Sequence, residues 1–193
     1  MTIANPPSLI GLLASRRSVN PNFLAGPGPS RAEIETLLTI ASRMPDHGKL
    51  APWRFLVIEG AARGRLGATA LDIHLKDAPT LDEAARQADL KRFALAPLVV
   101  GVVSQAREHA KIPVWEQQLS AGAVCMALSV AAKALGFSSA WLTEWPAYSA
   151  PFRAALGLAE DERIAGFVHI GCATITPEDR PRPALADIVT WLE

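Results

Sequence analysis

Residues 114–137, VWEQQLSAGAVCMALSVAAKALGF, form the stretch that decides the fold. Small and apolar residues cover most of its middle on nearly all faces, and Gly136 stands where a helix would end. A helix that is apolar all round is buried, either in a core or in a membrane. The charge-free run, residues 119–132, is shorter than the about 20 residues of a membrane span. We therefore predict a central buried helix whose small residues let another helix or a second subunit approach closely.

The bulk composition is that of one globular domain. Of 193 residues, 50% are hydrophobic and 20% are charged, so we expect a single domain over residues 1–193 with a C-terminal arm over about residues 174–193. A net charge of zero disfavours nucleic-acid or membrane-surface binding. Cys125 and Cys172 lie far apart, and residues 1–8 lack the pattern of a secretory signal. These features predict reduced thiols and a cytoplasmic location.

Hydrophobic periodicity outlines the other elements. Ser30 and Glu33 form a capping box ahead of a helix that Pro45 stops. Further helices are predicted over residues 9–17, 61–78, 81–93 and 149–156. Strands are predicted over residues 54–59, 97–104, 138–143 and 164–173. The pattern is mixed α and β, with helices dominant.

Several common kinds of site are disfavoured by the residue spacing. The chain has no HExxH motif and no GxSxG motif, and its four histidines are scattered, so we expect neither a metal site nor a serine nucleophile. Gly60, Gly64 and Gly67 follow a strand and open a helix, but their spacing is not that of a dinucleotide-binding turn. No residue is assigned a catalytic acid, base or nucleophile role.

What remains is a set of groups suited to an anion and a flat ligand. Arg16, Arg17 and Ser18 could bind a phosphate through charged, fork-shaped donors, or they could be solvated residues at a helix end. Arg43 and His47, on a polar loop, could bind ligand carbonyl or hydroxyl groups, or simply face water.

A second group of residues lies later in the chain. Trp141, Leu142 and Thr143 could line one side of a heterocycle, or belong to ordinary packing. Arg180 and Arg182 could contact an anion or belong to a polar arm. The residues alone leave these alternatives open.

Taken together, these motifs resemble the FMN-dependent nitroreductase family, in particular its compact NAD(P)H-dependent bacterial members. The resemblance covers nearly the whole chain in order and spacing. Its motifs are RRS at 16–18, RMPDHGKLAPWRFLVIEG at 43–60, APLVV at 96–100, KIPVWEQQLSAGAVCMAL at 111–128, AAKALGF at 131–137, WLT at 141–143 and the IGCA strand with its RPRP tail.

The resemblance implies an α+β fold, with a mainly antiparallel sheet wrapped by helices and a long central helix at the interface of a homodimer. Each FMN site is then shared between two subunits. Arg16, Arg17 and Ser18 would hold the phosphate and ribityl end, with Arg182 as a further phosphate contact. Trp141, Leu142 and Thr143 would line the isoalloxazine, and Arg43 and His47 would reach the FMN of the other subunit. Nicotinamide-nucleotide contacts would come from Ala131, Ala132, Lys133, Ala134, Leu135 and Gly136.

The implied activity is a ping-pong transfer of hydride from NAD(P)H through flavin N5 to a nitroaromatic or quinone-type acceptor. Two alternatives keep the flavin: another reaction, such as reductive dehalogenation or flavin fragmentation, or a flavin-binding dimer with little turnover. The chain departs from the compact relatives at two places, with Leu142 where an arginine or lysine is usual and Glu144 where glycine is usual. Loss of a cation and gain of a carboxylate would disfavour negative charge on the flavin.

Overall fold

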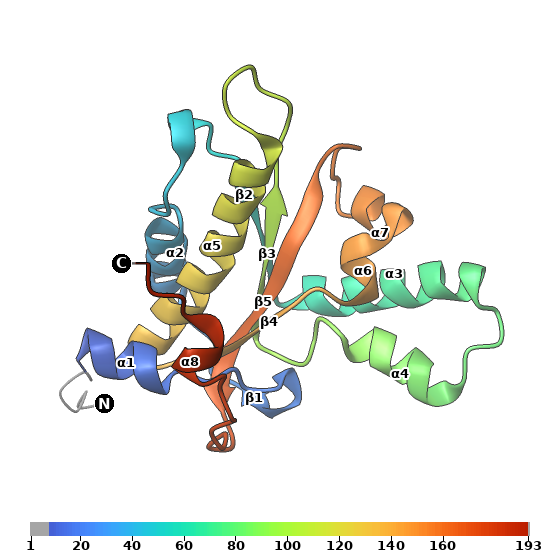
Figure 1. Cartoon of the computed structure of the whole chain (residues 1–193). Helices are drawn as coiled ribbons and strands as arrows, with labels where there is room; N and C mark the ends of the chain where they lie inside the picture. Colours follow the sequence, from blue (N-terminus) through green and yellow to red (C-terminus); the bar gives the residue numbers. More distant parts are fainter. Residues whose placement is uncertain (1–7, 193) are drawn as a thin grey trace.

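The structure, a computed structural model that describes residues 8–192, is an α+β fold in which helices cover both faces of one sheet (Figure 1). This confirms the predicted fold class. The helices are α1 (Leu9–Ser15), α2 (Arg31–Ala41), α3 (Ala61–Asp77), α4 (Glu83–Lys91), α5 (Val114–Ala134), α6 (Glu144–Tyr148), α7 (Ala150–Ala155) and α8 (Leu185–Ile188). The strands are β1 (Leu24–Ala25), β2 (Trp53–Glu59), β3 (Leu98–Ser104), β4 (Ser138–Leu142) and β5 (Arg163–Ala173), with single 3-10 turns η1 (Pro21–Phe23) and η2 (His47–Lys49).

The sheet is antiparallel at every pairing in the described part of the chain. Its strand order is β1-β5-β3-β2, and β4 also pairs with β5. Val100 of β3 lies opposite Val57 of β2 and Val168 of β5. With 11 residues, β5 is long enough to pair with β1, β3 and β4, so it organises the sheet.

The two faces of the sheet carry separate cores. Helices α2 and α5 cover one face, where Val124 and Leu128 pack with Val168 of β5. On the other face Phe93, Phe152 and Phe167 form an aromatic cluster with ring centroids 5.2 and 5.5 Å apart. Successive side chains of a strand point to opposite faces, which explains how β5 serves both cores.

Helices α3 and α4 approach each other at backbone level on the second face. A Cβ atom at Gly67 would overlap the Leu90 carbonyl group, so this glycine is what allows the close contact. Helix α4 begins later than predicted because the Asp82 side chain accepts a hydrogen bond from the Ala85 N–H and caps it. The sequence did not predict the short helix α6.

Helix α5 is the predicted central helix, and it ends at Ala134 because Gly136 adopts a left-handed conformation with φ 88°. Neither α5 nor any other helix within residues 8–192 is long and apolar enough to cross a membrane. Small residues on α5 were expected to face a partner. Ser120, Ala121 and Ala127 are instead buried in this chain, and only Gly122 and Ala123 remain partly exposed.

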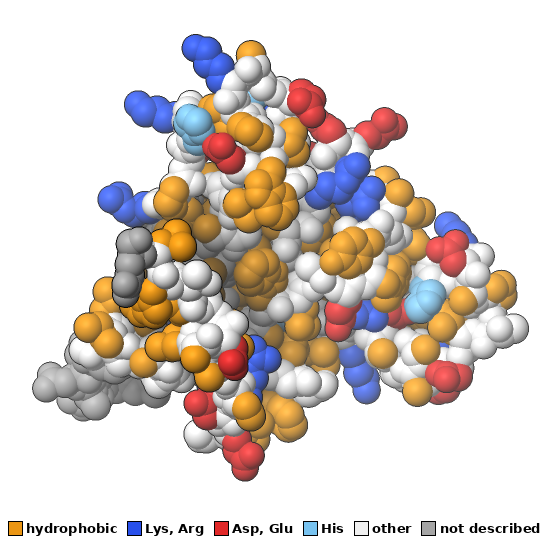
Figure 2. Space-filling model, in the orientation of Figure 1, with side chains coloured by type: hydrophobic (Ala, Val, Ile, Leu, Met, Phe, Trp, Pro, Cys, Tyr) orange, Lys and Arg blue, Asp and Glu red, His pale blue; other side chains and the backbone are white. Residues whose placement is uncertain are grey.

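The outward face of α5 carries apolar side chains, as its all-round apolar pattern predicts. Its exposed side chains include Trp115, Leu119 and Met126, and hydrophobic atoms gather over this region in Figure 2. Exposed apolar residues of α1 and of the C-terminal arm lie on the same side of the molecule: Leu9, Ile10, Leu13, Leu185, Ile188, Trp191 and Leu192 (Figure 1). Exposed apolar side chains gathered on one side of a protein are typical of an interface.

A bidentate ion pair ties the edge strand β2 to the start of β5. Arg54 donates from Nε and Nη2 to the two carboxylate oxygens of Glu162, both at 2.6 Å. Gln105 Nε2 and the Ala159 N–H also donate to this carboxylate, at 2.9 Å each. The hydrogen bonds from Arg54, with those from Ala159 and Gln105, lower the pKa of Glu162 to about 2.

Glu162→Gln is expected to lower the free energy of unfolding by about 2 kcal/mol at pH 7, because Arg54 loses a nearly buried partner. The folded pKa lies below the usual 4.5, so this stabilisation is present above pH 4.5 and is lost as the pH falls toward 2. Urea unfolding at one protein concentration should therefore show a smaller difference from wild type at pH 3 than at pH 7. An equal difference at both values would contradict the assignment.

Candidate functional site

The segment that carries Arg16, Arg17 and Ser18 leaves α1 and runs beside β4. The Val19 N–H donates to the Ser139 carbonyl at 3.0 Å, which fixes this segment against the strand. Arg16 forms the C-cap of α1, and the Arg17 side chain is about one-fifth exposed. The sequence thus places a permanently charged group next to the strand that ends in the WLT motif.

Two arginines far apart in the chain converge on one carboxylate oxygen. Arg17 Nη1 donates to the Glu178 carbonyl and lies 3.5 Å from Asp179 Oδ1. Arg182 Nη2 lies 3.6 Å from that same oxygen. A hydrogen bond from the Arg180 N–H, together with Arg182 and Arg17, lowers the pKa of Asp179. The donor set therefore suits an anion, and a side-chain carboxylate occupies it here.

The WLT motif forms the end of β4 and the turn into α6. Trp141 Nε1 donates to the Ala165 carbonyl at 3.1 Å, and a Cβ atom at Gly166 would overlap the indole ring. The ring therefore lies against the β5 backbone while 42% of the residue stays exposed. Thr143 Oγ1 accepts a hydrogen bond from the Tyr148 hydroxyl at 3.1 Å. This arrangement presents an indole surface and a hydroxyl group at the strand end.

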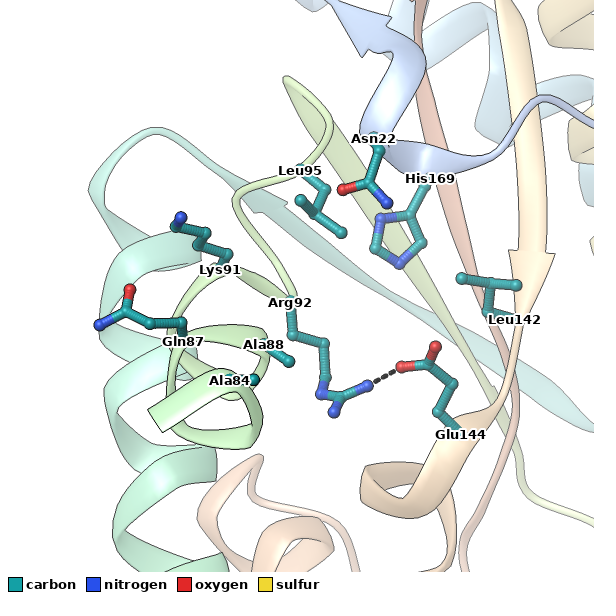
Figure 3. Close-up of a pocket in the computed structure, with 10 residues that line it drawn as sticks. All are labelled: Asn22, Ala84, Gln87, Ala88, Lys91, Arg92, Leu95, Leu142, Glu144 and His169. Atoms are coloured by element: carbon teal, nitrogen blue, oxygen red, sulfur yellow. Dashed lines mark ion pairs between the residues drawn. The ribbon is translucent and has the colours of Figure 1, made fainter. Parts of the chain in front are cut away.

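A cavity of about 320 Å³ opens beside this turn (Figure 3). Its walls come from the η1 segment, α4, the β4–α6 turn and β5, and the lining residues are Asn22, Ala84, Gln87, Ala88, Lys91, Arg92, Leu95, Leu142, Glu144 and His169. Leu142 lines the cavity, so the cavity adjoins the end of β4 that carries the WLT motif.

Two buried nitrogens in the cavity wall have no hydrogen-bond partner among the described residues. They are Arg92 Nε and His169 Nδ1. Burial, with a contribution from the charge of Arg92, lowers the pKa of His169 to about 4, so this imidazole is neutral at pH 7. Unpaired buried polar groups are rare and call for a ligand or water.

Arg43 and His47 lie in a different part of the chain, on the loop between α2 and β2. His47 Nδ1 is 2.7 Å from Glu116 Oε2, and Ser120 Oγ donates to the Pro45 carbonyl at 2.5 Å, so the loop is held to the first turns of α5. The structure gives neither residue a hydrogen bond or ion pair to Arg17 or to the WLT motif. Their predicted contact with a cofactor therefore depends on a second subunit.

The residues predicted to bind the nicotinamide nucleotide, at the end of helix α5, differ in their exposure to solvent. Ala131 and Ala132 are buried in the core of this chain, whereas the four residues 133–136 are exposed. Only the latter four can face a ligand. Within residues 8–192, no three His, Cys, Asp or Glu residues are grouped so that they could hold a metal ion.

From the sequence, Glu144 is expected near the flavin, whereas Arg92, Asp89 and His169 have no predicted role. Arg92 and Asp89 lie in a stretch that reads as an ordinary polar helix. His169 could have been noticed from the sequence, because it is the single side chain with nitrogen or oxygen atoms in the apolar run of residues 164–173.

Comparison with known proteins identifies the family of this chain. Residues 13–172 match the model of the nitroreductase family. The Escherichia coli (strain K12) protein named "Putative NAD(P)H nitroreductase YdjA" is 38% identical over 160 residues, which is 83% of this chain and 85% of that protein. The chain belongs to the nitroreductase family, which confirms the resemblance drawn from its motifs.

Solved structures show the same fold. A nitroreductase-like family protein from Bacillus cereus superposes with a TM-score of 0.83 at 22% identity, with 99% of both chains covered. The FMN-dependent nitroreductase NfnB from Mycobacterium smegmatis, solved in complex with NADPH, gives a TM-score of 0.75 at 18% identity over 94% of this chain and 96% of that one.

Proposed function

We propose that this protein is an FMN-dependent oxidoreductase that uses NAD(P)H to reduce nitroaromatic or quinone-type acceptors. The observation that carries the proposal is the convergence of Arg17 and Arg182 on one carboxylate oxygen, next to a segment that is hydrogen-bonded to β4. Family membership and the names of the relatives support the same activity. Bound FMN would supply two-electron transfer between the nicotinamide and the acceptor in alternate half-reactions.

The chain's own residues would bind and orient the cofactor. Arg16, Arg17, Ser18 and Arg182 would hold the phosphate and the ribityl end, since guanidinium groups match phosphate oxygens in charge and geometry. Residues 141–143 would line the isoalloxazine ring. The neutral His169 and the Arg92 guanidinium offer donors or acceptors to its polar edge. No side chain is assigned a proton-transfer role, because solvent can supply protons in an open site.

We further propose a homodimer in which each cofactor touches both subunits. The exposed apolar surface of α1, α5 and the arm would be buried between subunits. Arg43 and His47 of the partner subunit would then reach the cofactor, and residues 133–136 would contact NAD(P)H. Cys125 and Cys172 are free thiols, which suits the predicted cytoplasmic location.

The test is a titration of the purified protein with FMN, followed by anaerobic mixing with NADH or NADPH. We expect a yellow protein whose flavin absorbance bleaches with at least one nicotinamide and returns on addition of a nitroaromatic compound or a quinone. A protein that neither contains nor takes up FMN would overturn the proposal. Bound flavin that does not bleach would favour the binding-only alternative, and product analysis would reveal dehalogenation or flavin fragmentation.

Gly122→Leu is expected to disrupt the dimer and reduce FMN content, because Gly122 lies on the outward face of α5 and a Cβ there already comes within 3.9 Å of the Trp141 ring. The measurements are the mass by analytical ultracentrifugation and the flavin-to-protein ratio. Gly64→Leu is the matched control, since Gly64 lies on α3 with open space around it. A Gly122→Leu protein that stays dimeric and yellow would remove α5 from the interface.

A further inference from the structure

Glu144 combines an unusual backbone conformation with an ion pair across the cavity. Its φ is +51°, a left-handed value that is uncommon for residues other than glycine, asparagine and aspartate. Its carboxylate forms an ion pair with the Arg92 guanidinium of α4 (Figure 3). Glycine would adopt this backbone without strain, so the ion pair is a local interaction that helps hold the turn in place.

Arg92 is itself held from the other side by a buried carboxylate. Asp89 is 1% exposed and accepts hydrogen bonds from Arg92 Nη2 at 2.8 Å, Trp145 Nε1 at 3.0 Å and His74 Nδ1 at 2.7 Å. The guanidinium is also 5.8 Å from the centre of the Trp145 ring. Arg92 thus has little freedom to move, and its charge sits in the cavity wall between two carboxylates.

The sequence suggested that this chain has lost a cation and gained a bare carboxylate next to the cofactor. The structure corrects that view. A cation is present, supplied by α4 instead of by the residue after Trp141, and the Glu144 carboxylate lies against it. What distinguishes this chain is therefore a guanidinium in the cavity wall that is flanked by two carboxylates, Asp89 and Glu144.

We propose that the Arg92–Glu144 pair sets the reduction potential of the bound cofactor, with Glu144 adding a negative charge to a guanidinium that Asp89 already pairs with. The proposal rests on FMN binding as proposed above. Reduction adds negative charge to the flavin, so a net positive wall favours the reduced form and a net negative wall disfavours it. A unit charge about 10 Å away, at an effective dielectric constant of about 20, changes such an equilibrium roughly tenfold.

Three variants remove the charges of Arg92 and Glu144, first one at a time and then together. Glu144→Gln removes one negative charge and should tighten reduced relative to oxidised FMN about tenfold, which raises the two-electron midpoint potential by about 30 mV. Arg92→Gln removes the positive charge and should shift the potential by a similar amount in the opposite direction. The Arg92→Gln/Glu144→Gln double variant restores the wild-type net charge and should return the potential close to the wild-type value.

The readout is the midpoint potential, measured by equilibrium dye titration of the FMN-loaded protein. Arg92→Lys keeps the charge without the fork geometry, so it should stay near wild type if charge, and not shape, matters. Glu160→Gln is the control, because Glu160 is an exposed carboxylate at the far end of β5 from His169. The Glu144→Gln variant is the decisive one, because it should fold normally. The Glu144 side chain is 46% exposed, and glutamine has the same size.

Bound FMN with the same potential in wild type and Glu144→Gln would overturn this inference and leave the proposed function standing. Equal shifts in Glu144→Gln and Glu160→Gln would also overturn it, because they would show a general charge effect. Failure of the wild-type protein to bind FMN would instead overturn the proposed function itself, and this inference with it.

Discussion

Arg17→Ala is expected to raise the dissociation constant for FMN about 10- to 150-fold. The Arg17 guanidinium is held beside β4, and it shares its acceptor, the Asp179 carboxylate, with Arg182. A hydrogen bond to a charged group contributes about 1.5–3 kcal/mol, which corresponds to that range of affinities. Fluorescence titration of the apoprotein with FMN measures the effect directly. Because Arg16 and Arg182 would remain, binding should be weakened and not abolished.

The matched control is Arg180→Ala. Within residues 8–192, Arg180 makes no side-chain hydrogen bond or ion pair, whereas its neighbour Arg182 points to Asp179. Arg180→Ala should leave FMN affinity within about twofold of wild type, while Arg182→Ala should weaken it. An Arg17→Ala protein with wild-type affinity, or equal losses at Arg180 and Arg182, would contradict the phosphate assignment.

Much of the fold could be predicted because local signals agree with tertiary burial. The capping box of Ser30 and Glu33 is present in both directions, with the side chain of each bonded to the backbone of the other. The run at residues 97–104 forms a strand in which all seven residues of β3 are buried, as a continuous apolar run indicates. The all-round apolar middle of α5 likewise corresponds to ten buried residues.

The features that the sequence did not predict leave no clear local signal in it. Which face of α5 would turn outward could not be derived from composition, because its small residues occur on every side. Helix α6 contains Pro146 in only five residues, so periodicity gives no signal for it. The ion pair between Arg92 and Glu144 joins two elements 52 positions apart, and single-sequence spacing does not reveal it.

Some residues of the candidate site could be predicted from the sequence, and others could not. Residues 16–18 and 141–143 were predicted from motifs, and the structure brings both segments to β4, where the Val19 N–H bonds to Ser139 near the start and residues 141–143 lie at the end. Their ligand roles stay predictions. Arg92 and His169 became candidates only when the cavity showed unpaired nitrogens, since that property belongs to packing and not to residue type.

Asp89→Asn is expected to give the largest loss of stability, about 3 kcal/mol at pH 7. The substitution keeps the size of the side chain but removes a buried charge to which Arg92, Trp145 and His74 all donate. Breaking a buried charge pair from one side typically costs 3–5 kcal/mol, and the lower end applies here because Glu144 still pairs with Arg92. Burial alone would raise the pKa of Asp89, but the hydrogen bonds from Arg92, His74 and Trp145 outweigh it and lower the pKa.

The sign of the pH dependence follows from that lowered pKa. Asp89 stabilises the fold fully above its usual pKa of about 4 and progressively less as acid protonates it, so the variant and wild type should converge at low pH. Urea unfolding at one protein concentration measures the loss, with Asp72→Asn on the exposed side of α3 as the control, expected within about 0.5 kcal/mol of wild type. Because Asp89 also restrains the guanidinium that faces Glu144, its loss should loosen the cavity wall. A difference below 1 kcal/mol would show that the cluster contributes little to the fold and would weaken the case that Arg92 is held in place.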